Sequence, residues 1–379
     1  MIFHHRISVF IFCFIISPLT LAQDLSIEDR FAAMEKRMQA LETMLHKQND
    51  VIKAKDEKIM ALENKIEDSS SSSTGGWFQK VELSGVVEVE ANSVSADGED
   101  DTSDIIVPTV ELGVNVQVND WVSAEIIALY EEETNNGGDL NIDTAMISLS
   151  DPDNIWFVNA GQFVVPFGTF ATNMVSDPLT LDFGETADSS IEIGLGNDTF
   201  SGSVYVFQGD KRDKINNFGL ALNATIENED FNLSGHIGYL NDLRETDGIG
   251  ELGGINSTDK SAGWIASVEL NAGAFSLIGE YLTASDSFSD AGNQKPKLFN
   301  IEGAYSFSLL DKPTIFAVGY QGTDDMSHTS WDGVTEQRLI STLSVEVLEG
   351  TTLLFEYKND EDYDGADTNT ATGKLAVEF

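Results

Sequence analysis

Residues 81–91, VELSGVVEVEA, decide the fold, because they alternate between apolar and polar side chains at every position except Val86. One face carries Val81, Leu83, Gly85, Val87, Val89 and Ala91. The other carries Glu82, Ser84, Glu88 and Glu90. A period of two is typical of a β-strand that presents one apolar face. The same pattern returns in later segments, at 110–118, 218–226, 299–307 and 339–347.

The connections between these segments come in two alternating lengths. Short turns are expected at 119–120, 151–154, 196–198, 227–230, 271–274, 310–312 and 349–350. Longer polar segments are expected at 96–103, 134–139, 165–188, 208–216, 243–261, 286–297, 323–335 and 360–370. Seven turns and eight loops connect sixteen strands.

This arrangement predicts an all-β transmembrane barrel of about 16 antiparallel strands over residues 77–379, preceded by an α-helical coiled coil. An even strand number, with short turns at one end and long loops at the other, is typical of bacterial outer-membrane barrels. Closure satisfies every backbone group in lipid. A soluble β-sandwich or β-helix is the alternative, but it would leave the phased loop lengths unexplained.

Residues 1–22 have the composition of a secretory signal peptide. Arg6 precedes an apolar run at 7–16, ISVFIFCFII, and Thr20-Leu21-Ala22 provides a cleavage site. A membrane anchor is the alternative, although the run is short and Pro18 interrupts it. Cys13, the only cysteine, lies in this run. After removal of the signal peptide the mature chain would contain no cysteine. It could then have no disulfide framework, no thiolate metal site and no cysteine nucleophile.

Residues 23–68 change to a heptad pattern, and 69–76, SSSSSTGG, form a flexible linker. The heptad seam carries Ile27, Phe31, Met34, Met38, Leu41, Leu45, Ile52, Ile59, Leu62 and Ile66. A single helix cannot bury this seam, so the pattern predicts a coiled coil and a homo-oligomer through 27–66, with a trimer favoured. A lone helix lying on another surface is the alternative. With an even number of strands, the first and the last strand of the barrel would both have their chain termini in the periplasm. We therefore expect the coiled coil in the periplasm too.

The last strand supports an outer-membrane location. Gly373, Leu375, Val377 and Phe379 share its apolar face, and the chain ends on Phe379. A terminal aromatic residue on an alternating strand resembles the signal read by the outer-membrane assembly machinery. We therefore expect that machinery, and outer-membrane lipid, as partners of this chain.

The barrel segment is strongly acidic. Residues 69–379 contain 53 Asp and Glu against 12 Lys and Arg. Alternation places many glutamates on the inner wall, among them Glu111, Glu125, Glu192, Glu269, Glu302 and Glu346. Such a wall favours cations and disfavours simple anions. The alternative is that these carboxylates only solubilise loops and satisfy hydrogen bonds in the lumen.

Residues 161–186, GQFVVPFGTFATNMVSDPLTLDFGET, break the alternation. Pro166 ends the preceding strand because it lacks an N–H, and Gly168 permits a sharp departure. We expect the 165–188 loop to fold into the pore and to decide what passes, although a plain surface loop is the alternative. Its candidate residues along the substrate path are Pro166, Phe167, Gly168, Phe170, Asn173, Asp177, Asp182 and Glu185.

Other constellations point away from enzyme and metal chemistry. Asp360, Asp362 and Asp364 begin a calcium-loop pattern, but Ala371 stands where the closing glutamate belongs, so we predict at best a weak cation site. Ser234 and His236 share one strand face and could form a nucleophile and a base. Both would face the lumen rather than lipid, so we predict no enzyme. No nucleotide motif or basic patch occurs, so neither a cofactor nor a nucleic-acid partner is expected.

The loop sequence also resembles a known family. GQFVVPFGTF at 161–170, followed by TNMVSDPLTLDFGET at 172–186, is similar to the hallmark of LbtU-like siderophore porins. The resemblance implies an outer-membrane porin for passive uptake of iron–siderophore complexes. Only 23–76 precede the barrel, too little for the plug of an energy-coupled receptor. The acidic charge departs from expectation, because many ferric siderophores are anions. The alternatives are a general cation-preferring porin without a specific ligand, and a barrel-anchored structural or adhesive coiled-coil protein.

Overall fold

The computed structural model describes residues 80–133, 137–153, 155–209, 214–252, 260–331 and 333–379. The expected signal peptide, coiled coil and linker all lie outside the described residues, so they stay predictions, as does the trimer through 27–66. No helix in the described ranges has the length and apolar character needed to cross a membrane.

The described residues form one sheet of 17 strands with short helices. The strands are β1 Val81–Ala96, β2 Thr102–Ile106, β3 Val110–Asn119, β4 Val122–Glu133, β5 Gly137–Ser150, β6 Trp156–Val164, β7 Ala187–Gly196, β8 Phe200–Phe207, β9 Asn217–Glu227, β10 Phe231–Leu240, β11 Gly263–Ala272, β12 Phe275–Ala284, β13 Lys297–Leu309, β14 Lys312–Asp324, β15 Thr335–Leu348, β16 Thr351–Asp362 and β17 Asp367–Glu378. The helices are α2 Leu179–Gly184, the 3₁₀ turn η2 Leu243–Glu245 and α3 Asp247–Glu251.

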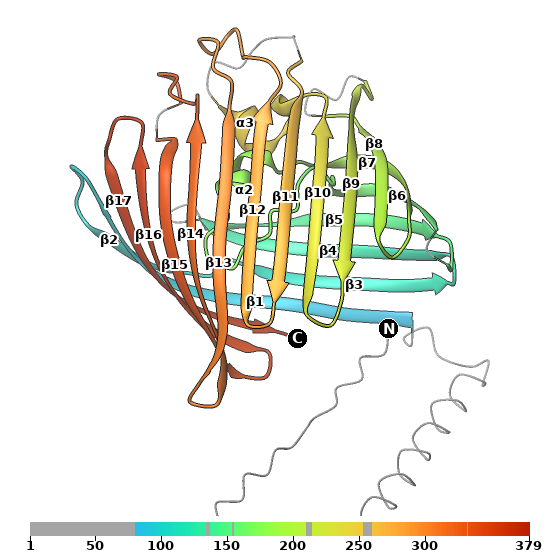
Figure 1. Ribbon diagram of the computed structural model, residues 1–379, viewed down its shortest axis with the longest axis horizontal. Helices are drawn as coiled ribbons and strands as arrows, with labels where there is room; N and C mark the ends of the chain where they lie inside the picture. Colours follow the sequence, from blue (N-terminus) through green and yellow to red (C-terminus); the bar gives the residue numbers. More distant parts are fainter. Residues whose placement is uncertain (1–79, 134–136, 154, 210–213, 253–259, 332) are drawn as a thin grey trace, which may run out of the picture. The chain divides into compact units, whose positions relative to one another are not determined.

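The sheet is a closed antiparallel barrel (Figure 1). From β3 onward each strand pairs with the next one along the chain, and β1 pairs with β17 to close the ring. β2 and β3 both pair with β1, one after the other along its length, so they share one position in the wall. Pro108 lies between them and has no N–H with which to continue the ladder. The wall therefore has the sixteen positions that the turn and loop lengths predict.

The outer face of the wall is apolar. Leu83 on β1 is 64% exposed, Ile126 on β4 51% and Leu222 on β9 60%. Exposing such side chains to water costs about 25 cal/mol per Å² of apolar surface, so this face requires apolar surroundings. Aromatic side chains gather at both rims, as in membrane barrels. The rim contacts include Trp121 with Trp156, Phe218 with Tyr239, and Tyr239 with Trp264.

Phe379, the residue expected to act as an assembly signal, lies at the seam of the barrel. Its N–H donates to the Gly85 carbonyl at 3.0 Å, and the Gly85 N–H donates back at 2.9 Å. A Cβ at Gly85 would come within 2.5 Å of the Phe379 ring. The glycine thus leaves room for the terminal ring, which covers it from the neighbouring strand. Aromatic rings often stabilise glycines in sheets in this way.

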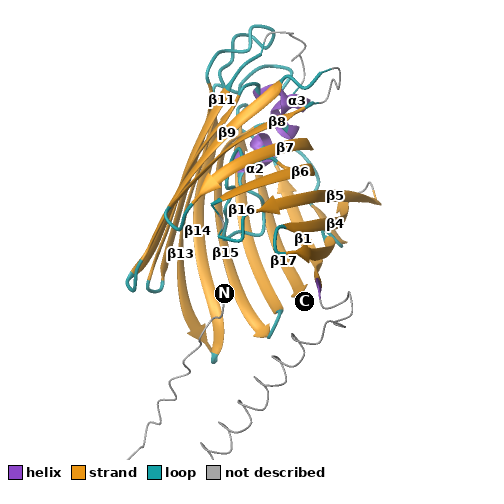
Figure 2. Ribbon diagram, turned by 90° about the vertical axis from the view of Figure 1, so that its right-hand side faces the viewer, coloured by secondary structure: helices purple, strands orange, loops and turns teal. Residues whose placement is uncertain are grey.

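The interior differs from the uniformly polar lumen that simple alternation predicts. Ile265, Leu282 and Leu298 point inward from β11, β12 and β13, and each is at most 1% exposed. They belong to one buried apolar cluster that also includes side chains from the loops. The inner face is apolar here because loops fold back onto it. Figure 2 shows α2 enclosed by the strands, and it packs against β12, β13, β14 and α3.

Candidate pore constriction

Residues 165–186, called the pore loop below, leave the wall where β6 ends and return where β7 begins. The Val165 N–H donates to the Thr186 carbonyl at 2.9 Å, so the two ends of the loop stay joined at the wall. The Phe167 N–H donates to the Val165 carbonyl at 2.7 Å across Pro166, which makes a tight three-residue turn. This turn directs the chain into the barrel.

The apolar side chains of the pore loop form its root. It is buried in the cluster with Ile265 and Leu282, and its side chains are Val165, Phe167, Phe170 and Leu179. Gly238 on β10 makes the root possible, because a Cβ there would overlap the carbonyl oxygen of Phe167. His236, two residues earlier on the same face, places Nε2 2.8 Å from that carbonyl oxygen.

A row of inward polar residues runs from strand to strand along the wall, from β9 to β16. Each member is directly opposite the next in the strand register, and we call this row the polar hoop. Its members are Asn223, His236, Ser267, Glu280, Asn300, Gln321, Arg338 and Asp360. Because strand pairing fixes the spacing, the hoop offers the pore loop one polar group per strand.

Glu280 is the hoop residue that holds the root. Its Oε2 accepts from the backbone N–H groups of Thr169 and Phe170, both at 3.2 Å. Its Oε1 accepts from the Thr180 hydroxyl at 2.6 Å. Ser267, the neighbouring hoop residue, bonds the Thr169 hydroxyl at 2.8 Å. A carboxylate only accepts hydrogen bonds, so it suits a loop that presents a row of N–H groups.

Two further buried glutamates hold the tip of the loop. Glu302 on β13, 1% exposed, accepts from the Asn173 N–H and from the Thr172 hydroxyl, both at 2.7 Å. Glu356 on β16, 5% exposed, accepts from the Ser176 N–H at 3.1 Å and from its hydroxyl at 2.6 Å. Charge-assisted bonds of this kind are about twice as strong as neutral ones. The tip is therefore tied to strands distant from the root.

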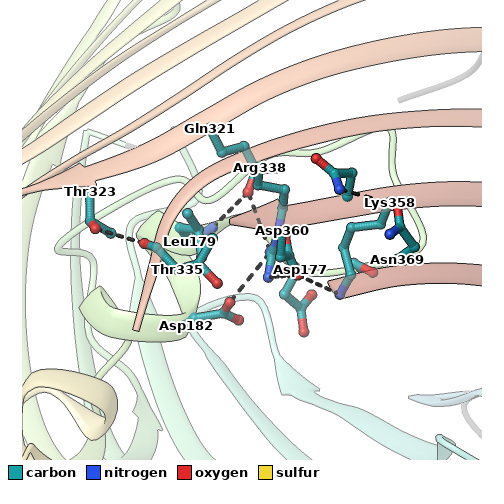
Figure 3. Close-up of polar contacts among 12 residues, drawn as sticks. Asp177, Leu179, Asp182, Gln321, Thr323, Thr335, Arg338, Lys358, Asp360 and Asn369 are labelled. Carbon is teal, nitrogen blue, oxygen red and sulfur yellow. Dashed lines mark hydrogen bonds and ion pairs between the residues drawn. The ribbon is translucent and has the colours of Figure 1, made fainter. Parts of the chain in front are cut away.

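Arg338 on β15 is the main cation at the loop (Figure 3). Its Nη1 donates to the Asp177 carbonyl at 3.0 Å and lies 3.6 Å from an Asp182 carboxylate oxygen. Its Nε donates to Asp360 at 2.7 Å, and Lys358 reaches the same carboxylate at 3.7 Å. The guanidinium thus joins the polar hoop to the start of α2 and helps to fix where the acidic side chains of the loop project.

Asp182 of α2 and Glu185, which directly follows α2, lie in an environment that favours their neutral forms. Enclosure within the barrel raises the pKa of Asp182 to about 6, although Arg338 opposes the shift. Enclosure, together with Asp247 and other carboxylates, raises the pKa of Glu185 to about 7. The charge of the loop therefore changes near neutral pH.

Some carboxylates of the inner wall form hydrogen bonds or ion pairs within the described ranges, and others, called free below, do not. Glu111, Glu125, Glu269 and Glu346 are half-buried, and within the described ranges they form no hydrogen bond or ion pair. Glu192 accepts from the Asn159 amide at 2.9 Å, and Glu88 pairs with Lys374 at 3.0 Å. The free carboxylates are the groups available to attract a cation.

The structure places the eight expected loop residues in three different settings. Phe167 and Phe170 are buried in the root, and Phe167 has no exposed surface, whereas Pro166 and Gly168 beside them are half-buried. Asn173 is bound at the wall by Glu302. Asp177 and Asp182 are exposed, and Glu185 is half-buried.

Several anchoring residues were not singled out from the sequence as loop contacts. Glu280 carries a usable signal, because it is a lone acid among the apolar inward residues Ile278 and Leu282. His236, Ser267 and Gln321 are isolated polar residues of the same kind. Alternation shows which face they occupy, but only the strand register aligns them in one hoop.

The residues considered for catalysis and cation binding have structural partners. His236 uses Nδ1 to contact the Asn223 amide oxygen at 2.7 Å, so with Phe167 both ring nitrogens are occupied. Asp362 accepts from the N–H groups of Asp364 and Ala366, while Asp360 belongs to Arg338. In the described part of the chain, no three His, Cys, Asp or Glu side chains are arranged to hold a metal ion.

Comparisons with known proteins agree with a porin-type barrel. No family model matches the chain. A UPF0422 protein of Coxiella burnetii is 25% identical over 285 residues, which cover 69% of this chain. The chain spans about 60% of the length of the curated relatives it matches.

Two solved structures show the same fold at low sequence identity. Pseudomonas putida OprB has a TM-score of 0.58 at 10% identity, covering 82% of this chain and 97% of OprB. An anion-selective porin from Comamonas acidovorans has a TM-score of 0.57 at 12% identity, covering 79% of this chain and 99% of that porin. These likenesses show the fold alone.

Proposed function

We propose that this chain is an outer-membrane diffusion channel whose constriction is the pore loop. One observation carries the proposal: inside the barrel, the loop is bonded to inward side chains of every strand from β10 to β16. A loop that only covered the surface would not need this set of buried partners. The porin-type fold and the apolar outer face support an outer-membrane location.

The proposed path runs past the acidic side of the loop. A solute would pass between Asp177 and Asp182 on the loop and the wall that carries Lys358 and Lys374. Free carboxylates such as Glu111 elsewhere on the wall would raise the local concentration of cations. Transport through such a path is passive, because only the concentration gradient of the solute drives it.

As the finer proposal, the solute is an iron–siderophore complex. Its support is the resemblance of 161–186 to the LbtU-like siderophore porins. The acidic wall favours complexes that are neutral or positively charged overall, since fixed carboxylates repel an anionic complex. A second candidate, a general cation-preferring porin, is favoured by the free carboxylates on the wall.

The constriction is tested by single-channel conductance in planar bilayers. We expect the double variant Glu302→Ala and Glu356→Ala to release the loop tip, with larger and noisier conductance than the wild type. Glu346→Ala, which removes a free wall carboxylate, is the matched control and should leave the channel size unchanged. Equal conductance in all three proteins would exclude the pore loop as the constriction, and absence of any channel would exclude a porin.

The ligand is tested separately by iron-limited growth of a deletion strain on a panel of siderophores that differ in charge. Loss of growth on one neutral or cationic siderophore, restored by the wild-type chain, is the expected result. Normal growth on every siderophore would reject the siderophore proposal and leave the general cation-preferring porin.

A further inference from the structure

A second loop packs against α2 of the pore loop. It follows β10, and its residues 241–252, called the brace below, contain η2 and α3, of which α3 contacts α2 (Figures 1 and 2). The wall holds the start of α2, where the Leu179 N–H donates to Gln321 at 3.0 Å. Because α2 has only six residues, and helices this short are unstable alone in water, its end needs support as well.

The brace supplies hydrogen-bond donors to the carboxyl end of α2. Thr246, which is 2% exposed, donates its hydroxyl to the Phe183 carbonyl at 2.8 Å, and the same hydroxyl lies 2.9 Å from the Leu243 carbonyl. The Asp247 N–H donates to the Glu185 carbonyl at 2.9 Å. The last carbonyls of a helix have no partner within the helix, so donors from another segment complete it.

Gly248 allows the brace to lie directly on α2. A Cβ at this position would overlap the carbonyl oxygen of Asp182. The next residue, Ile249, has no exposed surface and belongs to the same buried cluster as Leu179. A side chain at position 248 would therefore push the two loops apart at the residue that carries one of the acidic groups of the constriction.

The other end of the brace is fixed to the wall. The Leu243 N–H donates to the Ser261 carbonyl at 2.7 Å, and the buried Leu243 side chain covers Gly263 at the start of β11, where a Cβ would overlap it. Asp242, which is 2% exposed, caps η2 and pairs with Arg244 at 2.7 Å. The brace thus connects the end of α2 to β11.

The brace also brings a carboxylate to the acidic end of the pore loop. Enclosure within the barrel, followed by the charge of exposed Asp247, raises the pKa of Glu185 to about 7. The other charged groups that act on Glu185 are also acidic, namely Asp177 in the pore loop, Asp143 on β5 and Glu131 on β4. Since a like charge disfavours ionisation, Asp247 raises the pH at which Glu185 gains its proton.

We propose that the brace is a second determinant of the constriction, in which Thr246 and Gly248 position the end of α2 and Asp247 sets the charge that a cation meets at Glu185. This inference rests on the proposed channel function and extends it. Cation selectivity would then depend partly on a loop that follows β10, and not only on the pore loop that follows β6.

The pH dependence of selectivity tests the role of Asp247. Reversal potentials of the full-length channel in a KCl gradient are recorded between pH 8 and pH 5. Asp247→Asn should shift the loss of cation preference toward lower pH by about 0.5–1 unit, because Glu185 ionises more easily without a like charge beside it. In a Glu185→Gln background, Asp247→Asn should cause no shift. Asp100→Asn, at an exposed position between β1 and β2, is the matched control and should keep the wild-type profile.

Single-channel recordings test the positioning by Thr246. Thr246→Val keeps the shape of the side chain and removes the hydroxyl, so the end of α2 should move and the conductance should fluctuate more than in the wild type. Thr246→Ser keeps the donor and should restore the wild-type record. Thr329→Val, at an exposed threonine between β14 and β15, is the matched control. The change in gel mobility on heating checks that each variant is a folded barrel.

The outcomes separate this inference from the proposed function. A wild-type record in Thr246→Val, or an equal shift by Asp247→Asn in the Glu185→Gln background, would overturn the role of the brace and leave the pore loop as the constriction. A wild type that formed no channel would reject the proposed function, and the inference with it.

Discussion

At the scale of single residues, Glu302 shows that part of the acidic wall has a structural use. It is 1% exposed and accepts four hydrogen bonds, including one from the Asn300 amide at 3.0 Å. Removing such an acceptor leaves buried donors unsatisfied, at about 1–3 kcal/mol each. Glu280 and Glu356 are used in the same way. The carboxylates that hold the loop are therefore not available to a solute on the proposed path.

Asp182 and Glu185 predict how selectivity depends on pH. Their raised pKa values, about 6 and about 7, mean that both are ionised at pH 8 and mostly neutral at pH 5. Cation preference should therefore decrease on acidification, with most of the change between pH 7.5 and 5.5. Reversal potentials in a KCl gradient measure it. Asp182→Asn with Glu185→Gln should flatten the profile, and a profile as steep as the wild type would show that other groups control selectivity.

At the scale of elements, the pore loop depends on the strand against which its root packs. Gly238 on β10 leaves room for the Phe167 carbonyl. Gly238→Val should displace the root and raise the single-channel conductance, because valine occupies the space of that carbonyl. Gly279→Ala on β12, where the nearest atom lies 3.6 Å away, is the control. Unchanged conductance in Gly238→Val would mean that the root does not set the pore width.

The closing strand pair gives a second prediction at this scale. Gly85→Val would force the Phe379 ring off β1, because the new side chain needs the same space. Overpacking of this kind costs about 1–3 kcal/mol, so the thermal midpoint of the barrel should fall. The change in gel mobility on heating, which reports unfolding of the barrel, measures this midpoint. Gly303→Val, at a site with open space, should melt like the wild type, and equal midpoints in both variants would argue against the ring contact.

At the scale of the whole molecule, the excess of 53 acidic over 12 basic residues in 69–379 predicts a salt-dependent selectivity. The screening length falls from about 10 Å at 0.1 M salt to about 3 Å at 1 M. The ratio of potassium to chloride permeability should therefore be highest in dilute KCl and approach that of a neutral pore at 1 M. Reversal potentials at both concentrations test this, and a ratio independent of salt would assign selectivity to close contacts at the constriction.

The two-residue period of the strands made much of this barrel predictable from its sequence. Alternation predicted that Glu192 and Glu302 face inward, since side-chain direction has a period of two. Loop lengths gave the number of wall positions, and Pro166 marked where the chain departs. That Phe167 is buried could not be read from the sequence, because its partners Ile265 and Leu282 lie on strands whose alignment depends on closure. The same holds for the hoop, where Gln321 and Arg338 meet only through register.

The anchoring of the loop tip also has a consequence for the order of events during assembly. The tip of the loop, near residue 176, is held by Glu356, which lies 180 positions later in the chain. Contacts of such separation form late, because the intervening chain must first be organised. The loop can therefore take its final place only when the last strands have joined the wall in the correct register. The constriction can therefore form only when assembly is complete. A barrel that lacks its last strands also lacks Glu356, which holds the tip of the pore loop.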